Sequence, residues 1–382
     1  MPNTLRSTMK KSRDISNRLI IKESNGLNDK LFWNESLQSW IVIDETLAKK
    51  VLTSSYFTTD RKRKLIETMS SSASNKEVLS NFYSNWLMYM DGERHLSLRK
   101  DLQRAMRNAD SQEEMLSSKV IKEILQNVNL SDKDIDVVKE ISVPFTNKFL
   151  SQLFGLSVDD YKQILQTSME AVKFLWQTNP SEEEIDLTVE SIKQTENLIV
   201  RIIKENRYED DRLFSCMLKD IDTSSLLTAI INMVIDGHEP FLSSVSSVIE
   251  RYLRYPEESV SRMITNSLKY SPPFSYCARS VFRPIRMENK DLNVGDRIMI
   301  ILYSLSDMSK DGDKTIGCPH ANLSFGHGSH YCLGAQITTK ALKAFIKEID
   351  LLFRERSVSV TKIEFNTSFG FQSIDFLHIK VS

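Results

Sequence analysis

Hydrophobic and polar positions alternate mostly at helical spacing along this 382-residue chain. Residues 129–211 form a nearly continuous amphipathic pattern, and Ser224 to Arg254 is apolar on all sides, which predicts one long buried helix. Strand-like alternation is limited to short stretches within Leu31–Ile43, Val294–Ile301 and Phe365–Val381. The pattern predicts a mainly α fold with a smaller β region (α+β).

The organisation predicted from this pattern is one large domain, residues 30–382, after a polar N-terminal segment, residues 1–29. The domain should open with a hairpin over Leu31–Ile43, followed by a short helix from Glu45 to Leu52. Within the long apolar helix, Pro240 has no N–H, so the carbonyl of Asp236 loses its partner and the helix should kink. A loop between two helices is the alternative interpretation.

Composition narrows the class of protein. The hydrophobic fraction is 41% and the charged fraction 26%, which is typical of a globular chain with a large core. A net charge of −1 gives no electrostatic case for nucleic acid or an anionic membrane. The 4 widely spaced cysteines indicate a reducing compartment, and we expect a cytoplasmic protein without a membrane anchor.

The most informative stretch runs from Phe325 to Gln336, where three glycines, two histidines and one cysteine occur in twelve positions. Glycine suits backbone that turns with positive φ or approaches something flat. A helical pattern follows Cys332, so its thiol should lie where a loop enters a helix N-terminus. That end of a helix favours a thiolate.

Three interpretations of this stretch are open: a turn with a structural cysteine, a zinc site, or a haem iron held by a cysteine thiolate. The spacing argues against zinc, because His330 and Cys332 are too close for comfortable tetrahedral ligation. The possible zinc ligands would be Cys318, His320, His327, His330 and Cys332.

The pattern Phe-Gly-x-Gly-x-His-x-Cys-x-Gly, from Phe325 to Gly334, resembles the haem-binding signature of the cytochrome P450 family at every defining position. The resemblance implies haem b with Cys332 as the axial ligand of the iron. It also implies that Phe325 covers the proximal haem face and that Gly326 and Gly334 allow close approach.

Other expected haem contacts lie elsewhere in the sequence. His95 and Arg99 are four residues apart, so on a helix they could clasp a carboxylate or phosphate, or belong to a solvated basic face. The surrounding Met-Asp-x-x-x-His-x-x-x-Arg resembles the family's propionate-binding helix, which implies that both residues bind haem propionates. Arg279 and Asn322 stand at the family's further propionate positions.

The same helix is basic, and the resemblance implies that it docks an acidic electron-transfer partner, a ferredoxin or flavodoxin. The residues expected near this docking site are Arg94, Lys100 and Arg104.

The sequence also departs from the family pattern. Asp236 to Pro240 resembles the oxygen-binding groove Ala-Gly-x-Glu-Thr, with Gly237 and Glu239 matched. Asp236 replaces the small residue, and Pro240 replaces the threonine whose hydroxyl assists proton delivery. Asn266 and Lys269 stand in place of the family's buried Glu-x-x-Arg pair.

We therefore expect a monomeric haem-thiolate monooxygenase that oxidises a small-molecule or carrier-bound substrate in specialised-metabolite biosynthesis. Its catalytic residues would be Asp236, Gly237, Glu239 and Pro240, with Glu239 relaying protons through water. The departures keep two alternatives open. One is haem-thiolate chemistry outside that cycle, such as peroxide-driven oxidation, oxidative coupling, rearrangement or dehydration. The other is a non-catalytic haem-binding or recruitment protein.

Overall fold

The computed structural model describes residues 29–60, 62–109, 112–128, 134–177, 179–302, 323–366 and 370–382. The chain divides into two compact units, which we describe separately. Unit 1 comprises residues 1–58, 117–145 and 240–382, and unit 2 comprises residues 59–116 and 146–239. The predicted N-terminal segment lies, except for its last residue, outside the described residues. A single domain over residues 30–382 stays a prediction.

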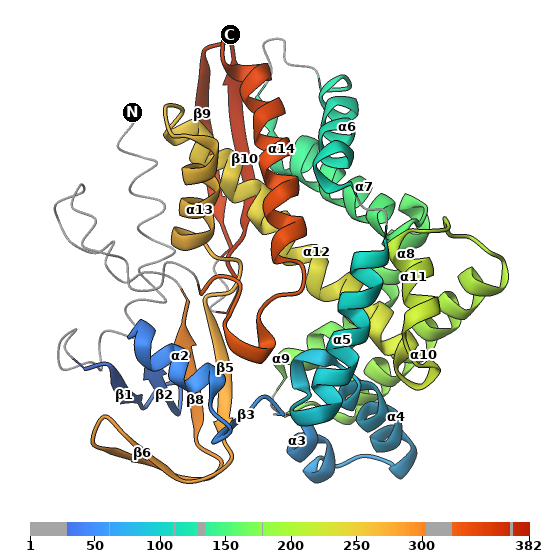
Figure 1. Ribbon diagram of the computed structural model, residues 1–382, viewed down its shortest axis with the longest axis vertical. Coiled ribbons are helices and arrows are strands. Elements are labelled where there is room, and N and C mark those ends of the chain that lie inside the picture. Colours follow the sequence, from blue (N-terminus) through green and yellow to red (C-terminus); the bar gives the residue numbers. More distant parts are fainter. Residues whose placement is uncertain are drawn as a thin grey trace. The chain divides into compact units, whose positions relative to one another are not determined.

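Unit 1 carries all the strands of the described residues (Figure 1). A five-stranded sheet has the order β1-β2-β8-β5-β3, with β2 and β8 parallel. A second sheet has the order β4-β10-β9, and β6 and β7 form a separate pair. The strands are β1 Leu31–Asn34, β2 Ser39–Val42, β3 Phe57–Thr58, β4 Ile135–Asp136, β5 Tyr276–Val281, β6 Ile285–Met287, β7 Lys290–Leu292, β8 Arg297–Ile301, β9 Val358–Phe365 and β10 Ile374–Val381.

The predicted N-terminal hairpin is confirmed, because β1 and β2 pair in antiparallel register from Leu31 opposite Val42 to Asn34 opposite Ser39. The predicted short helix is also confirmed as α2, Glu45–Thr53, whose N-cap Asp44 accepts a hydrogen bond from the Leu47 amide. Apolar residues of α2 pack with one face of the five-stranded sheet in a buried cluster. This packing holds the C-terminal end of α2, which contacts residues 323–334.

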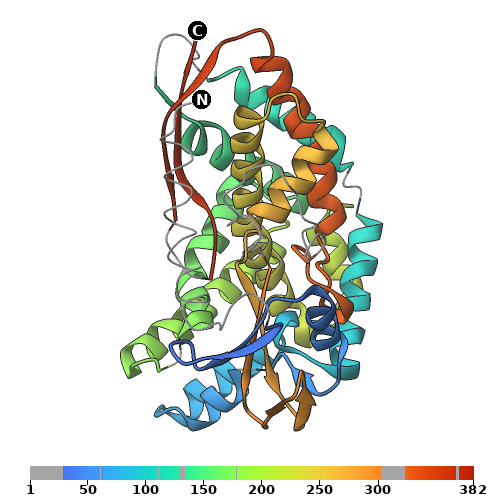
Figure 2. The same ribbon diagram turned by 90° about the vertical axis from the view of Figure 1, so that its left-hand side faces the viewer.

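Further helices of unit 1 are α13, Val260–Tyr270, and α14, Ala335–Phe353, which lie side by side (Figure 2). Three helical segments contribute residues to both units. These are α6 Glu113–Leu125, α7 Val143–Phe154 and α12 Thr223–Arg254. A π-helical turn, Val138–Ser142, precedes α7.

Among the described residues of unit 2, every regular element is a helix. Capping follows the sequence signals: Ser181 and Glu184 form a capping box at the start of α10, and Gly155 ends α7 with a φ of 76°. Its own helices are α3 Lys62–Thr68, α4 Ala73–Ser84, a 3-10 turn Leu87–Tyr89, α5 Gly92–Asn108, α8 Val158–Thr167, α9 Met169–Trp176, α10 Glu182–Lys204 and α11 Leu213–Asp220.

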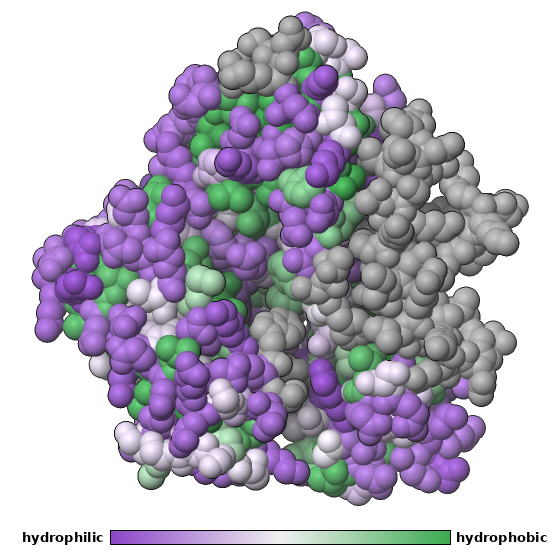
Figure 3. Space-filling view, turned by 180° about the vertical axis from the view of Figure 1, so that it is seen from behind, coloured by the Kyte–Doolittle hydropathy of each residue, from purple (hydrophilic) through white to green (hydrophobic). Residues whose placement is uncertain are grey.

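The predicted long helix is confirmed as α12, Thr223–Arg254, and its helical assignment continues through Pro240. The alternative of a loop between two helices is therefore wrong. Over the described residues, no helix is both long enough and apolar enough to cross a membrane. On the face of the molecule that Figure 3 shows, hydrophobic residues appear as separate patches among hydrophilic ones.

Candidate functional site

The cysteine loop, which we define as Leu323–Gly334, is a compact turn in unit 1 closed by its own backbone. The amide of Gly326 donates to the carbonyl of Leu323 at 2.8 Å, and the amide of Cys332 donates to the carbonyl of Phe325 at 2.8 Å. Gly326 and Gly328 have φ angles of 74° and 73°, a region that favours glycine. The loop therefore needs these two glycines to fold back on itself.

The other glycine contacts show how closely this loop is packed. A Cβ at Gly328 would lie 3.0 Å from the Thr53 side chain and 3.1 Å from the Leu52 carbonyl oxygen, both at the end of α2. A Cβ at Gly334 would lie 3.9 Å from the Cys332 sulfur. The loop is thus seated on α2, whereas a Cβ at position 334 would make only an ordinary van der Waals contact with the sulfur.

Cys332 is exposed, and α14 begins at Ala335 immediately after the loop. The predicted position at a helix entrance is confirmed, and it favours a thiolate. An accessible thiol flanked by glycine backbone fits the sulfur ligand of a haem. Among the described residues, no cluster of three or more potential ligands could hold a metal ion, so His327, His330 and Cys332 do not form one. Cys318, His320 and Asn322 lie outside the described residues.

Arg279 also belongs to unit 1, on strand β5, which lies between β8 and β3 in the five-stranded sheet. Arg279 is 8% exposed, and its guanidinium donates to the carbonyl of Ala278 at 2.9 Å. Its role as a propionate donor stays a prediction.

In unit 2, α5 carries His95 and Arg99 one helical turn apart. His95 is buried and Arg99 is half-buried, so the solvated basic face does not describe His95. Their roles toward haem propionates stay predictions.

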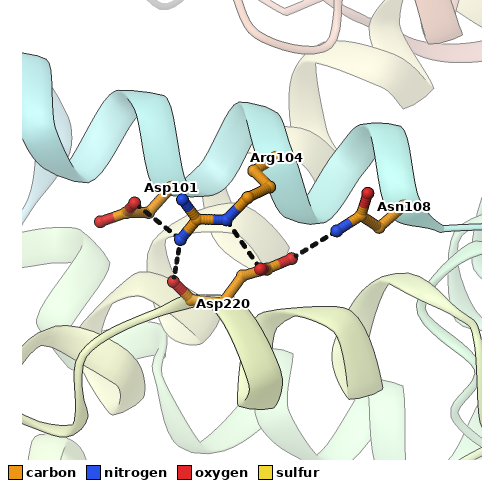
Figure 4. Close-up of polar contacts among 4 residues, drawn as sticks. All are labelled: Asp101, Arg104, Asn108 and Asp220. Atoms are coloured by element: carbon orange, nitrogen blue, oxygen red, sulfur yellow. Dashed lines mark hydrogen bonds and ion pairs between the residues drawn. The ribbon is translucent and has the colours of Figure 1, made fainter.

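The basic face of α5 is partly compensated by acidic neighbours. The Arg104 guanidinium donates to Asp101 at 2.9 Å and to the Asp220 carboxylate at 2.8 Å, and it also donates to the Asp220 carbonyl at 2.9 Å (Figure 4). Asn108 donates to the same Asp220 carboxylate at 3.0 Å. Arg104 therefore links α5 to the end of α11, whereas Lys100 is exposed.

Asp236 is the centre of a polar network on α12. One carboxylate oxygen, Oδ2, accepts hydrogen bonds from the Trp86 indole at 3.0 Å and from the Asn232 amide. The Asn232 side-chain oxygen accepts from the Leu87 amide at 3.3 Å. Burial raises the pKa of Asp236 to about 6, although the two hydrogen bonds oppose this shift. A carboxyl of this kind can hold and release a proton near neutral pH.

Neighbouring positions on α12 have different surroundings. A Cβ at Gly237 would meet nothing within 4 Å. His238 is buried against Tyr161, whose hydroxyl lies 3.3 Å from its Nδ1, and burial lowers the pKa of His238 to about 4. Glu239 is exposed to solvent, and partial desolvation raises the pKa of its carboxyl. Pro240 is the first residue of α12 that belongs to unit 1.

Proteins of known family resemble this chain in sequence and in structure. A scan against protein-family models finds no match. "Cytochrome P450 119" of Sulfolobus acidocaldarius is 23% identical over 255 residues, which cover 61% of this chain and 65% of that protein. The "Biotin biosynthesis cytochrome P450" of Bacillus subtilis is 20% identical over 268 residues, 65% of this chain and 67% of that protein. The matches thus span about two thirds of these relatives.

Solved structures resemble the whole chain. P450BioI, crystallised in complex with hexadec-9Z-enoic acid ligated acyl carrier protein, has a TM-score of 0.79 and 17% identity, covering 98% of this chain and 99% of that chain. CalO2 has a TM-score of 0.79 and 17% identity, covering 98% and 97%. The fold is that of the cytochromes P450, and the sequence relatives of this chain carry the same family name.

The structure also contains a polar cluster that the sequence did not reveal. Arg251 forms a bidentate ion pair with Glu258, and Asn266 donates to the same carboxylate. Arg251 lies in α12, Glu258 in the connection and Asn266 in α13, so the periodicity of a single helix could not find the cluster. By contrast, Asn232 and Asp236 are four apart on one helix, a spacing that could have suggested their contact.

Proposed function

We propose that this protein is a haem-thiolate oxidoreductase of the monooxygenase type, with Cys332 as the iron ligand. The cysteine loop is the observation that carries the proposal, because it presents an exposed thiol on glycine backbone at the entrance of α14. Phe325, Gly326 and Gly334 would lie against the haem, which is haem b in our proposal. Bound there, the haem supplies the electron-transfer and oxygen chemistry of the reaction.

The chain's own residues would manage protons and orient the cofactor. His95, Arg99 and Arg279 are cationic or hydrogen-bonding side chains suited to the propionates, and Asn322 would be a fourth donor. Asp236, whose pKa is about 6, is protonated in about a tenth of molecules at pH 7. It can therefore donate a proton and recover it, with the exposed Glu239 exchanging protons with water.

In this proposal Asp236 compensates for the hydroxyl that Pro240 lacks. Its Oδ2 is engaged by Trp86 and Asn232, while Oδ1 has no hydrogen-bond partner within the described ranges and can accept one from water or substrate. Gly237, the residue after Asp236, leaves open space next to it in the helix. A substrate bearing a hydroxyl or amine would suit this acceptor.

Substrate and partners belong to the same proposal. A small-molecule or carrier-bound substrate in specialised metabolism is supported by two neighbours. One is the P450BioI complex with an acylated carrier protein, and the other is a structure of an unusual P450-like monooxygenase from microbial secondary metabolism. We further propose a cytoplasmic monomer reduced by a ferredoxin or flavodoxin. Lys100 and Arg94 are the better docking candidates, because Arg104 is already held by Asp101 and Asp220.

A second candidate function is peroxide-driven oxidation, and Pro240 is the observation that favours it. This residue gives α12 no hydroxyl at the position where the family delivers protons. Hydrogen peroxide supplied as the oxidant would not require that proton delivery.

The variant Pro240→Thr distinguishes the two functions. We would measure NADH consumption and hydrogen peroxide release with a ferredoxin and its reductase, and peroxide-driven oxidation of a phenolic dye. A monooxygenase predicts that the variant leaks a smaller share of electrons to peroxide than the parent. Efficient dye oxidation by the parent, with an unchanged leak in the variant, would support the peroxide function. Absence of redox activity under both oxidants would contradict both.

A further inference from the structure

We propose that Arg251, Glu258 and Asn266 form a polar brace that positions the cysteine loop by holding α13 in place. All three residues, the helix and the loop belong to unit 1. The inference rests on the proposed function in one respect, the role of Cys332 in that loop as the iron ligand. The brace acts through other residues, so these are positioning residues.

The ion pair at the centre of the brace is well defined. Arg251 Nε donates to Glu258 Oε2 at 2.5 Å, and Nη2 donates to Oε1 at 2.9 Å. The two side chains are 15% and 11% exposed. A two-bonded guanidinium–carboxylate pair fixes orientation as well as distance, and its burial protects it from screening by salt.

The carboxylate of this pair stays ionised. Burial alone would raise the pKa of Glu258, but hydrogen bonds from Arg251 and Asn266 lower it below its ordinary value. Removing either charged partner would leave the other buried and uncompensated, which is more costly than removing both.

The brace contacts α13 at two points on one face of that helix. Asn266 donates from its side-chain amide to Glu258 Oε1. The Arg251 guanidinium carbon lies 5.7 Å from the centre of the Tyr270 ring, and it also lies 4.7 Å from the Tyr255 ring. Asn266 and Tyr270 are four residues apart, so both contacts restrain the same face and the rotation of α13 about its axis.

From α13 the restraint reaches the loop through hydrogen bonds. Between the two contact points, the carbonyl of Leu268 accepts a hydrogen bond from the Ser324 hydroxyl at 2.7 Å. Ser324 precedes Phe325, whose carbonyl accepts the Cys332 amide at 2.8 Å. The path from ion pair to sulfur-bearing residue is thus continuous.

This cluster also accounts for the family's missing Glu-x-x-Arg pair. Asn266, at the position of that glutamate, is neutral but binds a carboxylate that already has an arginine partner. Lys269 is half-buried and its ammonium lies 5.3 Å from the Tyr270 ring. A different ion pair therefore supplies a charged anchor to the same helix.

Hydrogen–deuterium exchange of the haem-free full-length chain tests the brace without relying on activity. We expect backbone amides of residues 323–334 to exchange about fivefold faster in Asn266→Ala, as the loss of one buried hydrogen bond of about 1 kcal/mol implies. Glu258→Gln should have a larger effect, because it leaves Arg251 buried without its counter-charge. Arg207→Met is the matched control, since it breaks the pair with the buried Asp160 in unit 2.

Near-ultraviolet circular dichroism verifies that each variant is folded. If Glu258→Gln does not fold, Asn266→Ala still provides the test. Faster exchange of the loop in Asn266→Ala, but not in Arg207→Met, supports the brace. Unchanged exchange in Asn266→Ala, or equal acceleration in Arg207→Met, overturns it. Haem binding by the parent is measured separately: if the parent binds no haem but loop exchange responds, the proposed function fails and the brace stands.

Discussion

Individual residues in this chain show two opposite uses of glycine. Gly328 has a positive φ and would place a Cβ against α2, so its role is to let the cysteine loop turn and pack. Gly237 lies within α12 and has open space beside it, so its role is to leave room. Substituting each by alanine separates the two roles.

For Gly328→Ala we expect a loss of about 1–2 kcal/mol in the free energy of unfolding, because alanine is strained at this φ and crowds Thr53 and Leu52. For Gly237→Ala we expect a gain of about 0.5–1 kcal/mol, since alanine is the better helix former. Urea unfolding of both variants checks this. A stabilised Gly328→Ala would contradict the packing of the loop.

Asp236 should make stability depend on pH. Its folded-state pKa is raised from 3.8 to about 6, so its contribution favours folding most below pH 4 and is lost as pH rises through 6. The loss amounts to about 2 kcal/mol. We expect Asp236→Asn to remove this decline, measured as the difference in unfolding free energy between parent and variant from pH 4 to 7. A constant difference over that range would count against the buried network.

His238 should show the opposite dependence. Its pKa is lowered from 6.5 to about 4, so its contribution to stability is complete above pH 6.5 and is lost as pH falls through 4. We expect His238→Gln to lose less stability than the parent when the pH is lowered from 7 to 4, by about 3 kcal/mol. Acid unfolding followed by circular dichroism measures this. A parent no more acid-sensitive than the variant would refute it.

At the level of elements, local patterns were predictive and distant pairings were not. The hairpin β1–β2 and the helix α12 follow from period and turn residues that lie together in sequence. The strand β4 was missed, because its Ile135 pairs with Ile379 of β10 and two residues carry no period of their own. The strand pattern predicted within Phe365–Val381 contains β10, whereas β9, Val358–Phe365, was missed except for its last residue.

The clamp between α5 and α11 gives a prediction at this scale. Arg104→Met should lower the free energy of unfolding only slightly, because the guanidinium makes three hydrogen bonds but is 44% exposed, so solvent screens its ion pairs. Its effect on the KM for a reducing ferredoxin should be small. Lys100→Glu should instead raise that KM severalfold without loss of stability. Steady-state reduction assays with both variants decide this, and the reverse pattern would restore Arg104 to the docking site.

Considering the whole molecule, the fold could be predicted from the resemblance of one twelve-residue stretch to a family signature. The reason is physical: the thiolate ligand and the glycines around it are adjacent in sequence, so a short motif is enough to recognise the site. The bracing of that loop could not be predicted, since Arg251, Glu258 and Asn266 meet only after α12 ends and α13 begins. Asp236 was predicted as a groove residue, but its partner Trp86 is 150 positions away.

The most direct test of the central claim is the absorption spectrum of the purified chain, reduced and exposed to carbon monoxide. We predict a Soret band strongly red-shifted to the position typical of thiolate ligation, and its loss in Cys332→Ser, with Cys216→Ser as the control. A band typical of histidine or neutral-thiol ligation in the parent, or no haem spectrum at all, would contradict Cys332 as the thiolate ligand of the haem.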